Sequence, residues 1–127
     1  MPKKFIQLSS KPGYMKHNGG LLFREISKNE YEFKTKIKKN HLNMAGITHG
    51  GYIASIIDAG AGTGAHRSTD GKPCVTISLD IKFIGSTELG DEIIGFTFII
   101  SVAAVILLVR WSWNQGLISK PTENDFD

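Results

Sequence analysis

Residues His41–Asp58, HLNMAGITHGGYIASIID, decide the fold of this chain. Gly50 and Gly51 precede an apolar run, and glycines at the start of a helix let its free backbone N–H groups approach a ligand closely. Asp58 interrupts that run and is the only acid within the stretch. A carboxylate in apolar surroundings is either paired or functional. The stretch therefore predicts a helix that carries a polar site.

The helix is predicted from Gly51 onward, because small or apolar residues share one helical face: Ile53, Ile56, Ile57, Gly60, Ala61 and Gly64. The glycines at 60, 62 and 64 oppose a helix, since each costs about 1 kcal/mol relative to alanine. We therefore expect a sheet to pack closely against this helix, where glycines allow near backbone contact. Thr69-Asp70-Gly71 then forms a turn.

Strands are predicted on both sides of the helix. Residues 21–27 and 31–38 form a pair before it, and residues 39–48 form a loop. Residues 74–84 alternate apolar and polar side chains, as a half-buried strand does, and a further strand begins near residue 91. This order indicates an α+β fold with an antiparallel sheet.

Residues 93–109 contain no charged side chain. Because β-branched residues dominate them, we expect two buried strands joined near residues 101–104. The alternative is a membrane-spanning helix, for which a run of about 17 residues is the lower limit.

The chain of 127 residues has the length of one domain, 1–127, and its 41% hydrophobic and 21% charged residues are typical of a soluble globular protein. The single cysteine, Cys74, excludes an internal disulfide and favours a reducing, cytoplasmic location. The first residues lack the apolar run of a secretory signal.

Basic residues concentrate in residues 1–39, although the net charge is only +3. Such a concentration suits an acidic ligand, either a polyphosphate-bearing one or RNA. The simpler interpretation is a solvated strand face, because lysines at 34, 36 and 38 alternate with Phe33, Thr35 and Ile37. We favour that interpretation and expect no nucleic-acid partner.

The pattern His41-Leu-Asn-x-x-Gly-x-x-His-Gly-Gly, with Asp58 seven residues later and GSTELGDEI further on, resembles the hotdog-fold thioesterases. The most similar group is the acyl-CoA thioesterases of the phenylacetate-degradation type, over residues 10–95. The resemblance implies an antiparallel sheet wrapped around one long helix, hydrolysis of acyl-CoA, and dimers or dimers of dimers. It implies no cofactor, since coenzyme A is part of the substrate. Residues 96–127 depart from the family pattern.

The resemblance also implies roles for individual residues. Asp58 matches the catalytic carboxylate, and Gly50 matches the backbone donor of the oxyanion hole. Asn43 and His49 match polar residues beside the thioester, and Thr76 matches a hydroxyl that positions water. Each has a structural alternative: a turn residue for Asn43, a helix-start residue for His49, a paired acid for Asp58, and a strand former for Thr76.

Gly51 and Tyr52 are expected to contact substrate, although Tyr52 suits a plain core position equally. The remaining histidines, at 17, 41 and 66, show no metal-ligand spacing, and no metal site is expected. His66 and Arg67 suit the end of the helix, where cations complement its dipole.

Spacing alone predicts a two-fold dimer. Asp58 lies seven residues after Gly51, or about 10 Å along a helix axis. One helix can hardly place both an oxyanion donor and an acid on the same carbonyl, whereas a second copy supplies the other half. Three alternatives remain open: a hotdog dehydratase of hydroxyacyl thioesters, a non-catalytic acyl-thioester binding module, and a membrane protein.

Overall fold

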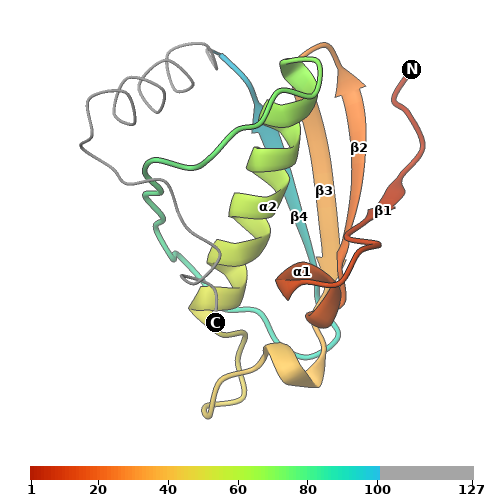
Figure 1. The fold of residues 1–127 in the computed structure, drawn as a ribbon. Helices are drawn as coiled ribbons and strands as arrows, with labels where there is room; N and C mark the ends of the chain where they lie inside the picture. Colours follow the sequence, from red (N-terminus) through yellow and green to blue (C-terminus); the bar gives the residue numbers. More distant parts are fainter. Residues whose placement is uncertain (101–127) are drawn as a thin grey trace.

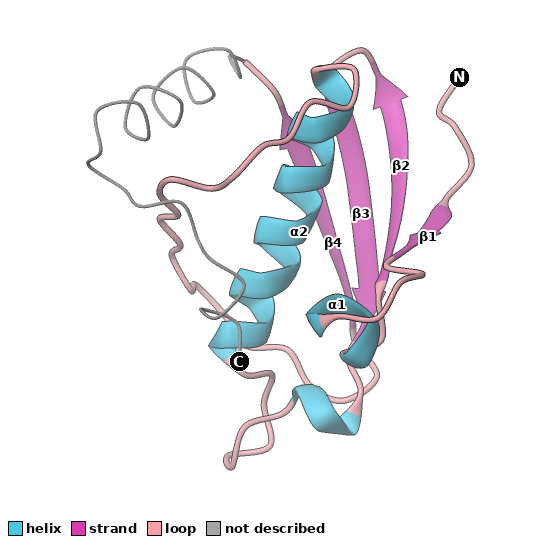
Figure 2. Cartoon of the chain, viewed as in Figure 1, coloured by secondary structure: helices cyan, strands magenta, loops and turns pink. Residues whose placement is uncertain are grey.

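The computed structural model describes residues 1–100. Its elements, in chain order, are β1 (Ile6–Leu8), α1 (Tyr14–His17), β2 (Leu21–Ser27), β3 (Glu30–Lys36), the 3-10 turn η1 (Lys39–His41), α2 (Gly50–Ser68) and β4 (Glu92–Phe98). Four strands form one antiparallel sheet in the order β1-β2-β3-β4, and α2 lies across one of its faces (Figures 1 and 2). The predicted α+β fold, with a sheet around a central helix, is confirmed.

The core lies between α2 and the inner faces of β2 and β3. Its buried side chains are Leu21, Phe23, Tyr31, Phe33, Ile37, Tyr52 and Ile56. Phe33 and Ile37 point inward while the lysines at 34, 36 and 38 are partly or fully exposed. The predicted solvated lysine face is therefore confirmed.

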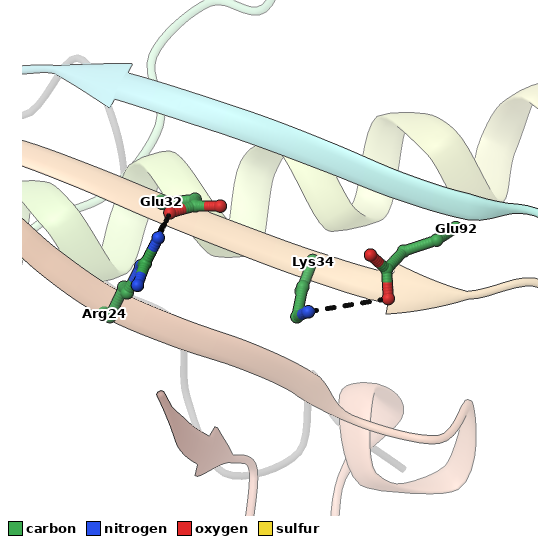
Figure 3. Close-up of polar contacts among 4 residues, drawn as sticks. All are labelled: Arg24, Glu32, Lys34 and Glu92. Carbon is green, nitrogen blue, oxygen red and sulfur yellow. Dashed lines mark hydrogen bonds and ion pairs between the residues drawn. The ribbon is translucent and has the colours of Figure 1, made fainter. Parts of the chain in front are cut away.

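That outer face is held together by ion pairs between neighbouring strands (Figure 3). Arg24 on β2 pairs with Glu32 on β3, and the Nζ of Lys34 lies 3.6 Å from a carboxylate oxygen of Glu92 on β4. Arg24 and Lys34 also contact the face of the Phe5 ring. These cations already have partners in the fold, which accounts for part of the basic concentration without a ligand.

Of the glycines at positions 60, 62 and 64 of α2, two permit close packing against the sheet. A Cβ added at Gly60 would overlap the ring of Phe33, and one added at Gly64 would lie 3.0 Å from a tyrosine ring on β3. Gly95 on β4 contacts Phe33 in the same way. The expectation of near backbone contact is confirmed at these positions. At Gly62 an added Cβ would meet no atom of residues 1–100 within 4 Å, so the expectation is not confirmed there.

The strand predicted over residues 74–84 does not form. In Figure 1 this segment runs along the side of α2 that faces away from the sheet. None of its backbone N–H groups donates to another residue of the described chain. The alternation of apolar and polar side chains favours a strand, but a strand also needs a neighbour, and pairing is not a local property of sequence.

β4 begins at Glu92, close to the predicted start, and occupies the first part of the uncharged run. A spanning helix that starts at residue 93 is therefore wrong. The prediction of a buried strand is also wrong for β4, because Ile94, Phe96 and Phe98 are exposed on its outer side. The second predicted strand and most of the atypical segment 96–127 lie outside the described residues. Within residues 1–100, no helix has the length and apolarity needed to cross a membrane.

Candidate functional site

The start of α2 is capped by the histidine of the His-Gly-Gly sequence. His49 has extended backbone, and its Nδ1 accepts a hydrogen bond of 2.8 Å from the Gly51 N–H. This bond satisfies one of the free donors at the helix start. The structure thus shows His49 and Gly51 as a helix cap, while their roles beside a thioester stay predictions.

Gly50 directly follows the His49 cap and is the first residue of α2. Its N–H donates to no other residue of the described chain, whereas the His49 N–H is bonded to the His41 carbonyl. The ring of Phe83 lies 3.4 Å from where a Cβ on Gly50 would sit. Gly50 therefore presents a free N–H at the positive end of a helix dipole beside an aromatic side chain, a geometry suited to an anionic oxygen.

Asn43 organises the loop before α2. Its Oδ1 accepts from the N–H of Ala45 at 2.9 Å and from that of Ile47 at 3.4 Å. Its own backbone N–H donates to the Ile47 carbonyl at 2.8 Å. These bonds match the turn role that the sequence left open for Asn43. Contact between its amide and a substrate stays a prediction.

A buried histidine anchors this loop to the core. The Nδ1 of His41 accepts from the Lys38 N–H at 3.0 Å, so its Nε2 donates to the Asn18 carbonyl at 2.8 Å. The ring stacks on Tyr52 with centroids 3.7 Å apart. His41 is therefore a buried core residue whose two ring nitrogens are both hydrogen-bonded.

Tyr52 lies in the core rather than on an open surface, since only 4% of it is exposed. Its hydroxyl lies 3.0 Å from the Thr35 Oγ1, and burial raises its pKa above 10.0. The structure therefore gives Tyr52 a packing role. The expected contact with substrate stays a prediction.

Asp58 and Thr76 come together across 18 residues of sequence. The Thr76 hydroxyl donates to the Asp58 Oδ1 at 2.5 Å. Asp58 lies on the side of α2 away from the sheet and is exposed in the described chain, so the expected apolar surroundings are wrong. The helical period explains the error, because Ile56 and Gly60 turn to the sheet while Asp58 turns away.

The pair opens onto a groove of about 710 Å³ between α2 and residues 73–76, lined by Asp58, Ala59, Gly62, Thr63, His66, Pro73, Cys74, Val75 and Thr76. Among the described residues, no lysine or arginine lines this groove. Residues 1–100 hold no group of three or more His, Cys, Asp or Glu side chains arranged to bind a metal.

The sequence missed Gly62, His66 and Cys74 as groove residues. His66 occupies the last turn of α2, as predicted, but its Nδ1 is hydrogen-bonded to the Lys72 carbonyl at 3.0 Å and its ring lines the groove. Asp58, Gly62 and His66 are spaced four apart and share one helical side, a signal that the sequence contained.

The two halves of the candidate site lie far apart within one chain. Asp58 lies eight positions after Gly50 on α2, which corresponds to about 12 Å along the axis. A carbonyl oxygen held about 3 Å from the Gly50 N–H is out of reach of the Asp58 in the same chain. Each chain therefore offers an oxyanion donor at one place and a carboxylate with a hydroxyl at another.

The sequence model of the thioesterase superfamily matches residues 45–110, which include the cap, α2, the Asp58–Thr76 pair and β4. The chain belongs to this superfamily. Its fold is the hotdog fold, an antiparallel sheet with a central helix. The crystal structure of zebrafish thioesterase superfamily member 2 is similar, with a TM-score of 0.64 over 72% of this chain and 67% of that one, at 19% sequence identity.

Two proteins of known sequence are related over shorter stretches. Acyl-coenzyme A thioesterase 13 of Mus musculus is 27% identical over 59 residues, which cover 46% of this chain and 42% of that protein. A Pseudomonas aeruginosa protein named provisionally as an esterase, PA0474, is 28% identical over 74 residues, covering 58% and 55%. The chain thus spans about half the length of these relatives.

Proposed function

We propose that this thioesterase-superfamily chain hydrolyses acyl-CoA thioesters and that Asp58 carries the reaction. The observation that carries the proposal is the Asp58–Thr76 hydrogen bond at the edge of an open groove. A carboxylate beside a hydroxyl suits the positioning of a water molecule for attack on a thioester. Small acyl or aryl-acyl groups, of the phenylacetate-degradation type, are the proposed substrates.

In the first route, Asp58 acts as a general base. It takes a proton from water as the water oxygen bonds to the thioester carbonyl carbon, and the carbonyl oxygen becomes an oxyanion held by a Gly50 N–H. The tetrahedral intermediate then expels the coenzyme A thiolate, which takes up the proton from Asp58. The products are the free acid and the free thiol.

In the second route, the Asp58 carboxylate attacks the carbonyl carbon directly and the thiolate leaves. A mixed anhydride forms, and water then hydrolyses it to the free acid and the Asp58 carboxylate, while the proton that water loses goes to the thiolate. Both routes need the same oxyanion donor and the same carboxylate. The proposal covers both.

We assign the other residues supporting roles. Thr76 holds the attacking water against Asp58. Asn43 and His49 stabilise the loop and the helix cap that position Gly50, and both lie beside the thioester. Gly51 lets substrate approach the start of α2, and Tyr52 holds this first turn in place by packing into the core.

A dimer completes the site in this proposal. The distance along α2 between Gly50 and Asp58 requires that each site take its oxyanion donor from one copy and its carboxylate from the other. Segment 75–84 supports this, because its backbone makes no hydrogen bond to the rest of residues 1–100 and the side chains of Val75, Ile77 and Leu79 are exposed, which suits burial against a second copy.

Release of free thiol from a panel of acyl-CoAs tests the proposal. We expect hydrolysis by the wild type and a fall of at least 100-fold in kcat for Asp58→Asn, since the reacting group is removed. Asp70→Asn makes the same change of charge at an exposed turn residue with φ of 55°, which asparagine adopts readily, and should keep full activity. Undiminished hydrolysis by Asp58→Asn would remove Asp58 from the reaction. Binding of acyl-CoA without thiol release by the wild type would show a binding module instead.

A further inference from the structure

Gly62 stands in the middle of α2, where glycine weakens a helix relative to other residues. Gly60 and Gly64 have a packing reason, because a Cβ at either would crowd an aromatic ring of β3. Gly62 has none, since a Cβ there would meet no described atom within 4 Å. The packing of residues 1–100 therefore gives no reason for glycine at this position.

The space above Gly62 is the groove that begins at Asp58 and Thr76 and extends to His66. Asp58, Gly62 and His66 follow one another on the same side of α2, one turn apart. A ligand whose reacting carbon lies at Asp58 and which follows this groove must pass over Gly62.

The lining selects an uncharged and mostly apolar ligand. Ala59, Pro73 and Val75 contribute apolar surface, and none of the lining residues within 1–100 is a lysine or arginine that could meet a phosphate. The Thr63 hydroxyl already donates to the Ala59 carbonyl at 2.7 Å. A hydrocarbon group on the apolar part of this lining requires no hydrogen-bond partner, whereas each amide of a pantetheine chain would need one.

We propose that the acyl group of the substrate lies over Gly62, in the groove from Asp58 to His66, and that the absence of a side chain at Gly62 determines which acyl groups fit. The ligand class is an uncharged acyl group longer than acetyl. This inference rests on the proposed function, because it places the thioester at Asp58.

The test compares hexanoyl-CoA with acetyl-CoA in Gly62→Ala and Gly62→Leu. Leucine is a good helix former, so the fold should persist, and far-ultraviolet circular dichroism checks this. We expect the ratio of kcat/KM for hexanoyl-CoA to that for acetyl-CoA to fall at least tenfold in Gly62→Leu and by less in Gly62→Ala. Ala65→Leu adds the same side chain on α2 outside the groove and should leave the ratio within twofold of the wild type.

The outcomes separate this inference from the proposed function. A ratio that stays constant in Gly62→Leu, or falls equally in Ala65→Leu, would overturn the inference while hydrolysis itself stands. A Gly62→Leu protein that changes its mass in solution would show that Gly62 serves contact between copies instead.

If the wild type releases no thiol at all, the proposed function fails, and the Kd of hexanoyl-CoA relative to that of coenzyme A decides the inference. Gly62→Leu should then raise the Kd of hexanoyl-CoA at least tenfold and that of coenzyme A less than twofold. An equal rise in both Kd values would overturn the inference.

Discussion

The Thr76 hydroxyl donates a hydrogen bond to the Asp58 carboxylate, although the two residues come from different segments and 18 positions separate them. α2 fixes Asp58, and the extended chain after it brings Thr76 back alongside the helix. This contact turns a single exposed acid into a pair that faces the groove.

Thr76→Val should lower kcat about 10- to 100-fold with little change in KM, because the shape is kept while the hydroxyl that positions the water is lost. Thr76→Ser keeps the hydroxyl and should recover most of the activity. Steady-state thiol release measures both. Ser78→Ala removes a nearby exposed hydroxyl and serves as the control. A Thr76→Val enzyme with wild-type kcat would contradict the pairing role.

Gly60 and Gly62 should respond in opposite directions to the same substitution. Gly60→Ala forces a methyl group into the ring of Phe33 and should lower the free energy of unfolding by about 1–3 kcal/mol. Gly62→Ala meets no described atom and should raise it by about 0.5–1 kcal/mol. Urea denaturation followed by circular dichroism measures the two values. Equal changes in the free energy of unfolding at both positions would contradict the close contact between Gly60 and Phe33.

Tyr52 should make stability fall at alkaline pH. Burial raises the pKa of its phenol above 10.0 in the folded protein, whereas the unfolded chain ionises at its ordinary value. The contribution of the protonated Tyr52 phenol to the free energy of unfolding is therefore complete below pH 10. It is lost as pH rises through the folded pKa, because the unfolded state then binds fewer protons than the folded state. Tyr52→Phe should flatten the dependence of unfolding free energy on pH between 9 and 11.

The control for that experiment is Thr35→Val. This variant removes the hydrogen bond between Thr35 and Tyr52 but keeps the phenol. Near neutral pH it should lower the free energy of unfolding by about 1 kcal/mol, as Tyr52→Phe does. Its stability should still fall above pH 10. A Tyr52→Phe protein with the wild-type slope would assign the alkaline loss to other groups.

The sequence predicted what depends on local patterns. Helical spacing located α2 and placed Ile56 and Gly60 against the sheet, and alternation located β2, β3 and the outward lysines. Residues 74–84 carry an equally clear alternation but form no strand in the described chain, because the partner of a strand is not encoded in its own period.

The same limit applies to the site. Sequence named Asp58 and Thr76 as members of one site, but it placed Asp58 in apolar surroundings that the structure does not show. The roles of Asn43 and His49 in the loop and cap depend on which N–H groups lie within reach of their side chains. The helix dipole already explains a histidine near the end of α2, so the sequence does not predict that His66 lines the groove.

The central claim is that one copy supplies the Gly50 N–H and another supplies Asp58. Gly50→Pro deletes this N–H alone, because proline is tolerated at the first helical position and the extended backbone of His49 suits the residue before a proline. Gly50→Ala keeps the N–H and serves as its control. Gly50→Pro and Asp58→Asn should each be nearly inactive, while Gly50→Ala should retain activity.

The most direct measurement is the rate of thiol release after the Gly50→Pro and Asp58→Asn proteins are unfolded together in equal amounts and refolded. Half of the resulting dimers contain one of each chain, and each of these has one intact site of two, so the mixture should regain about a quarter of wild-type activity. A mixture no more active than its two components, from proteins that refold fully, would contradict a site shared between copies.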